Sequence, residues 1–85
     1  MDTAKCIDGS IININLANFR PTCIQTDDGY NTYISEDGSL FRQSMGEDFG
    51  ENMFYLSSEI PQDLELFKTC RVEEPSKYNF YTKHN

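Results

Sequence analysis

The side chains in this sequence that could take part in chemistry are mainly carboxylates, and most of them stand in turn sequences. The stretch TDDGYNTYISEDGSLF, residues 26 to 41, holds two Asp-Gly steps, each with a further acidic residue beside it. Asp favours turns because its side chain accepts hydrogen bonds from the nearby backbone. Turn positions keep these carboxylates in solvent, so we expect burial to leave their pKa values unperturbed. The pattern indicates exposed anionic groups rather than the acid–base pair of a deep catalytic cleft.

Covalent catalysis by Ser or Cys requires a neighbouring base. The only histidine is His84, next to last in the chain, where terminal residues usually fray. The sequence also lacks a phosphate-binding glycine loop, a G-x-S-x-G motif and an H-E-x-x-H motif. We therefore predict a non-enzymatic protein with no catalytic residue.

The cysteines are Cys6, Cys23 and Cys70, an odd number without a C-x-x-C pair. A small disulfide-stabilised domain would normally show an even and denser set. A zinc site would need His84 as its fourth ligand, which disfavours zinc. We expect reduced, buried thiols, a cytoplasmic protein, and no metal or other cofactor.

Calcium is a weaker alternative, because residues 27 to 38 are rich in oxygen ligands. The stretch does not fit the calcium-loop template, since Asn31 and Glu36 fall at the wrong places. A weak surface calcium site formed by Asp27, Asp28 and Glu47 remains as the alternative.

The elements that position these groups are predicted to be mostly strands. Asp-Gly occurs three times, at residues 8–9, 28–29 and 37–38, between β-prone runs. It is typical of two-residue type I′ hairpin turns, in which both central residues adopt positive φ. We predict a hairpin over residues 4–16, with Ile12, Ile14 and Leu16 on one face, then a link through ANFRP. A three-stranded antiparallel meander is predicted over about residues 22–45.

The second half of the chain is less regular. Residues 46–52 read as a loop and residues 53–57 as a short strand. Residues 60–72 fit a short helix near 61–71, with Ile60, Leu64 and Phe67 on one face. The alternative is a strand, because Leu64, Leu66, Cys70 and Val72 also alternate. A turn at 73–76 and a last strand at 77–82 complete one β-rich α+β domain over residues 1–85, with an all-β fold as the alternative.

The net charge of −7 is unevenly distributed. Residues 22–67 contain ten acidic residues and a single basic one, Arg42. Successive turns of a meander lie at opposite ends of the sheet, and a seven-residue strand spans about 20 Å. We therefore expect a small acidic pair, Glu36 and Asp37, at one end and a larger acidic cluster at the other. The larger cluster comprises Asp27, Asp28, Glu47, Asp48 and Glu51.

Three aromatic residues, Phe49, Phe54 and Tyr55, lie in or just after the acidic loop. We expect them in the core rather than at an interface. If any of them faces solvent, an aromatic side chain ringed by carboxylates would have the form of a binding hot spot.

A dense anionic surface is a docking site for a basic partner, and cells use basic surfaces mainly to hold nucleic acid. We therefore expect a protein that inhibits or regulates a basic, nucleic-acid-handling partner, with nucleic-acid mimicry as one way to do so. Phage-encoded inhibitors such as anti-CRISPRs, and nuclease immunity proteins, are similar in size and charge only. Direct nucleic-acid binding is disfavoured, and the sequence has no membrane-spanning run or signal peptide. The alternative is a small structural or assembly subunit whose acidic residues only confer solubility.

Overall fold

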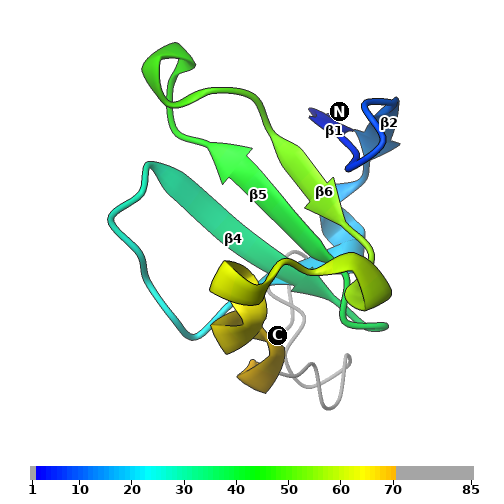
Figure 1. The fold of residues 1–85 in the computed structure, drawn as a ribbon, viewed down its shortest axis with the longest axis vertical. Helices are drawn as coiled ribbons and strands as arrows, with labels where there is room; N and C mark the ends of the chain where they lie inside the picture. Colours follow the sequence, from blue (N-terminus) through cyan, green and yellow to red (C-terminus); the bar gives the residue numbers. More distant parts are fainter. Residues whose placement is uncertain (1, 71–85) are drawn as a thin grey trace, which may run out of the picture.

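The computed structural model describes residues 2–70. They form one six-stranded mixed sheet with short 3₁₀ segments around it (Figure 1). The predicted turn at 73–76, the predicted strand at 77–82 and His84 lie outside the described residues. The strands are β1 (Asp2–Lys5), β2 (Ile11–Ile14), β3 (Phe19–Pro21), β4 (Tyr30–Ser35), β5 (Leu40–Ser44) and β6 (Met53–Tyr55). The 3₁₀ segments are η1 (Leu16–Asn18), η2 (Glu47–Phe49), η3 (Ser57–Glu59) and η4 (Gln62–Thr69).

The strand order across the sheet is β2-β1-β6-β5-β4-β3. Every neighbouring pair is antiparallel except β1 and β6, which are parallel and pair through Lys5 and Met53. The sequence predicts the antiparallel pairs β1–β2 and β4–β5, but it does not predict the pairs β3–β4 and β5–β6 or the parallel junction.

The N-terminal hairpin is confirmed, with Asp2 opposite Ile14 and Lys5 opposite Ile11. Its turn is not type I′, and neither is the turn between β4 and β5. In both, the loop has three residues and only the glycine, Gly9 or Gly38, has positive φ. This is the type I turn followed by a left-handed glycine. Only the third loop residue of this turn is left-handed, so Asp8 and Asp37 are not. The carboxylate of each accepts a backbone N–H two residues ahead.

The meander is confirmed for β4 and β5, but its predicted first strand is wrong. Residues 22–26 form a loop, and the strand beside β4 is instead β3, within the segment that the sequence suggests as a link. Thr22 donates its hydroxyl to the Ile24 carbonyl, and Cys23 is tied to Cys70, so this segment turns away from the sheet. The meander continues through β6, which confirms the short strand predicted at 53–57.

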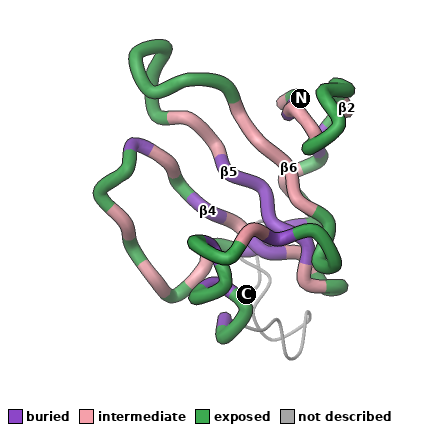
Figure 2. The backbone as a smooth tube through the Cα atoms, in the orientation of Figure 1, coloured by how far each residue is buried: buried purple, intermediate pink, exposed green. Residues whose placement is uncertain are grey.

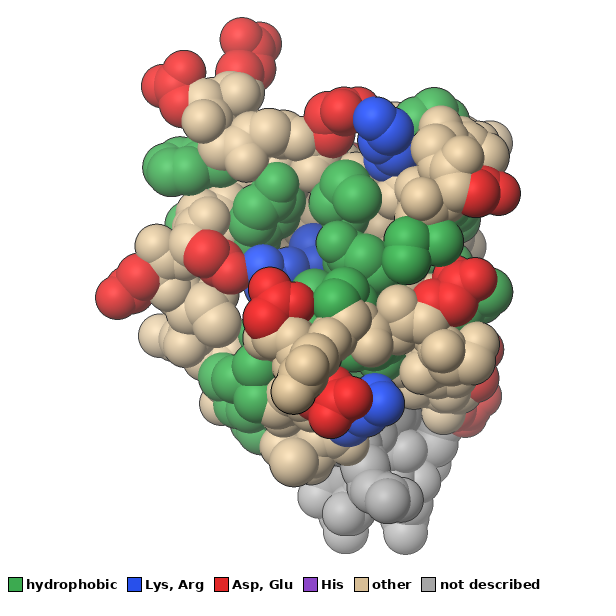
Figure 3. All heavy atoms as spheres, viewed as in Figure 1, with side chains coloured by type: hydrophobic (Ala, Val, Ile, Leu, Met, Phe, Trp, Pro, Cys, Tyr) green, Lys and Arg blue, Asp and Glu red, His purple; other side chains and the backbone are tan. Residues whose placement is uncertain are grey.

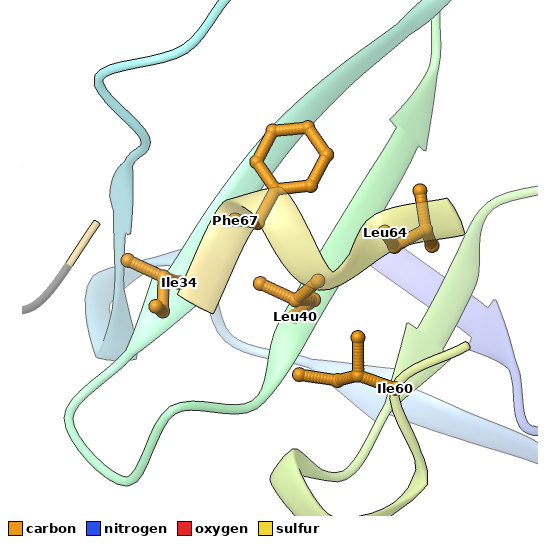
Figure 4. Close-up of a cluster of buried hydrophobic side chains, with 5 residues drawn as sticks. All are labelled: Ile34, Leu40, Ile60, Leu64 and Phe67. Carbon is orange, nitrogen blue, oxygen red and sulfur yellow. The ribbon is translucent and has the colours of Figure 1, made fainter. Parts of the chain in front are cut away.

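Alternation along the strands divides the core between the two sheet faces. Ile34 and Leu40 lie on one face, and η4 covers them with Leu64 and Phe67 (Figure 4). Phe41 lies on the other face in a second cluster. Figure 2 shows the buried residues concentrated along β4 and β5, at the centre of the sheet. The remaining members of the second cluster are Ala4, Ile14 and Phe19, with Ile12, Leu16, Tyr33 and Phe54 packed against it.

The predicted helix is present as the 3₁₀ segment η4, and the strand alternative is wrong. Pro61 is its N-cap, and Ile60, Leu64 and Phe67 all face the core, as the spacing predicts. The 3₁₀ form winds more tightly than the expected α-helix. No helix among residues 2–70 is long and apolar enough to cross a membrane.

A single amide side chain reinforces the parallel junction. Asn52 accepts a hydrogen bond from the Ser44 backbone N–H at 2.7 Å and donates one to the Thr3 carbonyl at 2.9 Å. Asn52 directly precedes β6, so its side chain links β5 to β1 just before the β6 strand begins.

Cys23 and Cys70 form a disulfide, so the expectation of reduced thiols is wrong for these two residues. Cys6 is a free, half-buried thiol. Sequence spacing could not reveal the pairing, because it joins residues 47 apart that only the fold of η4 onto the sheet brings together. The disulfide also removes the argument from reduced thiols on which the cytoplasmic expectation rested.

Candidate protein-docking surface

The three Asp-Gly turns share one local structure. In each, the Asp carboxylate accepts the backbone N–H of the residue two positions ahead and also a nearby hydroxyl. Hydrogen bonds from Ser10 lower the pKa of Asp8, and those from Ser35 and Ser39 lower the pKa of Asp37. The backbone donors are Ser10, Tyr30 and Ser39, and the hydroxyl donors are Ser10, Thr26 and Ser35.

Asp28 differs from the other two because it also holds a buried cation. Arg42 is only 7% exposed and forms an ion pair with the Asp28 carboxylate. The same guanidinium donates to the Thr32 hydroxyl at 2.7 Å and lies over the rings of Tyr30 and Phe67. Burial raises the pKa of Asp28, but hydrogen bonds from Arg42 and Thr26 and the Arg42 charge outweigh it, so the pKa is lowered. The expectation that burial would not perturb these acids is therefore wrong for Asp28.

The two acidic loops are brought together, as the meander predicts. Tyr30 donates its hydroxyl to the Phe49 carbonyl at 2.9 Å, within reach of the Glu51 carbonyl at 3.3 Å. The Met45 N–H donates to the Gly29 carbonyl at 2.9 Å. The ring of Phe49 lies so close against Gly29 that a Cβ there would overlap it. The loop of residues 46–51 projects beyond the ends of β5 and β6 (Figure 1).

Two large apolar side chains are exposed in these loops, Met45 at 55% and Phe49 at 52%. The expectation that Phe49 belongs to the core is wrong: its ring covers a glycine in a surface loop and keeps its outer side in solvent. Phe54 and Tyr55 are partly buried against the two core clusters, as expected. Sequence reasoning missed Met45, which follows directly after β5.

Three acidic residues of the same two loops, Asp27, Glu47 and Asp48, are also exposed. No hydrogen bond or ion pair among residues 2–70 involves their carboxylates. We call Asp27, Met45, Glu47, Asp48 and Phe49 the acidic loop end.

The other predicted site residues have different environments. Glu51 forms an ion pair with Lys5 at 3.5 Å, and Asp28 forms one with Arg42. Glu36 and Asp37 lie in the β4–β5 turn, at the opposite end of β4 from the acidic loop end, as expected. Near them, an open pocket of about 540 Å³ is lined by residues that include Arg20, Ser39 and Phe54.

The acidic residues do not form one continuous patch on the face seen in Figure 3. Hydrophobic side chains gather across its middle, and carboxylates stand around them singly or in small groups. Among residues 2–70, no three His, Cys, Asp or Glu side chains are arranged to hold a metal ion. The alternative calcium site of Asp27, Asp28 and Glu47 is therefore not assembled, because Asp28 is turned onto Arg42.

Exposed apolar side chains in a polar surface are common in protein interfaces, so these loops suit recognition of another surface. No protein-family model, curated protein or solved structure matches the chain.

Proposed function

We propose that this chain is a non-enzymatic interaction protein that inhibits or regulates a basic, nucleic-acid-handling partner. The observation that supports it is the acidic loop end, where two adjoining loops expose the ring of Phe49 and the carboxylates of Asp27, Glu47 and Asp48. These three carboxylates have no counter-ion among the described residues. Carboxylates without an internal counter-ion are available to lysine and arginine side chains of a partner.

The exposed ring of Phe49 adds an apolar contact to the charged groups of this surface. Aromatic and methionine side chains are enriched at interface centres, and aromatic anchors often dominate the binding free energy. Phe49 is held by the loop geometry over Gly29, so little conformational freedom would be lost on binding. The partner would bury Phe49 and Met45 and neutralise the surrounding acids.

The basic surfaces that fit such a site are those that otherwise hold phosphates. The chain would occupy such a channel in place of DNA or RNA and thereby inhibit the partner. We infer an α+β rather than an all-β class for the scaffold, because η4 supplies Leu64 and Phe67 to the core.

The first experiment is capture of partners from nuclease-treated lysate under non-reducing conditions, eluted with a salt gradient. The test variant is Asp27→Asn/Glu47→Gln/Asp48→Asn. Its matched control, Glu59→Gln/Asp63→Asn/Glu65→Gln, removes the same charge from exposed acids near and within η4. Asp28 is left intact because its loss would unpair buried Arg42.

We expect the wild type and the control variant to retain a basic nucleic-acid enzyme that moderate salt releases and its own DNA or RNA displaces. The test variant should lose it. Phe49→Ala should weaken binding of the purified partner at least about tenfold. Equal capture by the test and control variants, or retention that salt does not weaken, would refute the proposal and favour the solubility role.

A further inference from the structure

The outer edge of β2 carries backbone groups with no partner strand among residues 2–70. The Cys6 N–H donates to the Ser10 carbonyl at 2.8 Å, so these two residues are a hydrogen-bonded pair. Bonded and non-bonded pairs alternate along an antiparallel ladder. The N–H and C=O groups of Ile12 and Ile14 therefore point towards β1, while those of Ile11 and Asn13 point outward.

The contacts of β1 agree with this assignment. The Lys5 N–H donates to the Asn52 carbonyl at 2.9 Å, and the Thr3 carbonyl accepts from the Asn52 side chain. Both groups point towards β6 and away from β2. Lys5 and Thr3 are opposite Ile11 and Asn13, so the backbone groups of these β2 residues point away from β1, to the side where the described residues place no strand.

The chemistry of this edge differs from that of the rest of the surface. Residues 9–19 contain no charged side chain, in a chain whose net charge is −7. Ile11 is 59% exposed. β2 has no lysine, proline or bulge, which are three of the features that commonly protect an edge strand. A second acidic copy can approach here with little local repulsion.

We propose that β2 is the dimer interface of this protein, where two copies pair antiparallel to form one continuous sheet. In the register that fits best, Ile12 lies on the twofold axis opposite Ile12 of the second copy. Ile11 then pairs with Asn13 of the second copy, and Asn13 pairs with Ile11 of the second copy. This register uses the outward N–H and C=O groups of both residues in each copy.

Neighbouring registers form fewer backbone hydrogen bonds between the two copies. Placing Ile11 opposite itself, or Asn13 opposite itself, leaves half of the outward groups of β2 without a partner. Ile12 also favours the central register, because it already packs against the cluster that contains Ile14 and Phe41. In a non-bonded antiparallel pair the Cα atoms are about 4.5 Å apart, so the two Ile12 side chains would extend that cluster across the axis.

The test is the mass of the full-length protein in solution by light scattering and sedimentation, from micromolar to millimolar concentration. We expect the wild type to change from monomer to dimer over this range. Ile11→Lys places like charges diagonally across the twofold axis and should raise the dissociation constant at least about tenfold. Ile7→Lys is the matched control: Ile7 is 58% exposed but lies in the turn outside β2, so this variant should dimerise like the wild type.

Amide hydrogen exchange gives a second measurement that needs no substitution. The Ile11 and Asn13 amides should be protected at high concentration and exchange freely on dilution, while Ile12 and Ile14 stay protected at both. A wild type that remains monomeric at millimolar concentration would overturn the proposal. So would equal effects of Ile11→Lys and Ile7→Lys, or exchange at Ile11 and Asn13 that is independent of concentration.

Salt separates this interface from the acidic loop end. Dimerisation of two like-charged copies should strengthen as ionic strength rises, whereas docking to a basic partner should weaken. Each proposal can therefore fail without the other.

Discussion

At the scale of single residues, the pair of neighbouring aspartates Asp27 and Asp28 shows how differently two identical side chains can serve one loop. Asp28 turns inward to Arg42, and Asp27 remains in solvent. We therefore expect Asp28 to contribute more to stability and Asp27 to contribute more to the proposed docking.

Asp28→Asn should lower the free energy of unfolding by about 1–3 kcal/mol, because it leaves the Arg42 guanidinium buried without its carboxylate. Asp27→Asn is the control in the adjacent position and should change stability by less than about 0.5 kcal/mol. Urea denaturation of both variants measures the difference. Similar losses in the two variants would mean that the ion pair does not stabilise the fold.

Lowering the pH should also lower the free energy of unfolding, because it protonates the Asp28 carboxylate. Folding lowers the pKa values of Asp8, Asp28 and Asp37 below the ordinary value of 3.8. Their contribution to stability is therefore fully present above the unfolded-state pKa and is lost as the pH falls through the lower folded-state values. Urea denaturation between pH 6 and pH 2 should show the loss below about pH 4, and Asp28→Asn should lose less than the wild type. A pH-independent stability would contradict the lowered pKa values.

At the scale of elements, two contacts fix the loops and segments that surround the sheet. One is the stacking of Phe49 on Gly29, and the other is the disulfide between Cys23 and Cys70. Each can be tested against a closely matched position in the same chain.

Gly29→Ala should be more destabilising than Gly9→Ala. Both glycines have positive φ, 85° and 91°, so both variants incur the left-handed penalty of about 1–2 kcal/mol. Only at position 29 does the new methyl group overlap the Phe49 ring, since the space at position 9 is open. Thermal unfolding compares the two, and an equal loss would show that the ring moves aside freely.

Reduction of the Cys23–Cys70 disulfide should lower the free energy of unfolding by about 4 kcal/mol on chain entropy alone, because the bond closes a loop between residues 47 apart. Unfolding with and without a dithiol reductant measures this loss. The control is Cys6→Ser, which should remain sensitive to the reductant, while Cys70→Ser should become insensitive. Equal stability in oxidised and reduced samples would contradict the structural role of the bond.

The same elements show where sequence reasoning succeeds. The hairpin of β1 and β2 follows from local alternation and an Asp-Gly turn, and the core face of η4 follows from the spacing of Ile60, Leu64 and Phe67. The inward direction of Arg42 was not predicted, although Arg42 stands two residues after Leu40 and therefore shares its face of β5. A charged residue at a core-facing strand position needs a partner of opposite charge, which here is Asp28.

Sequence reasoning fails for contacts that depend on the overall fold. β3 could not be recognised because it is three residues long and contains Pro21, and its pairing with β4 comes from the fold rather than from local preference. The parallel junction and the disulfide also join segments far apart in sequence, so they carry no local signal. Of the candidate site, the meeting of the two loops was predictable, but the exposure of Phe49 and Met45 was not.

At the scale of the whole molecule, charge opposes folding. Residues 22–67 carry ten acids and one base, and ions in solution screen their mutual repulsion. The free energy of unfolding in urea should therefore rise as sodium chloride is raised from about 20 to 500 mM. A value that falls with salt would mean that attractive pairs such as Lys5–Glu51 and Asp28–Arg42 outweigh the repulsion.

The strand order has a kinetic consequence. The hairpin β1–β2 and the meander from β3 to β6 are each built from pairings of consecutive strands, so each can form after only short loops close. Among residues 2–70, just one pairing, that of β1 with β6, joins the first described strand to the last one in sequence. The entropic barrier to assembly is thus concentrated in that step. On a ribosome the hairpin would wait for Asn52 and Met53 to emerge before it could join the sheet.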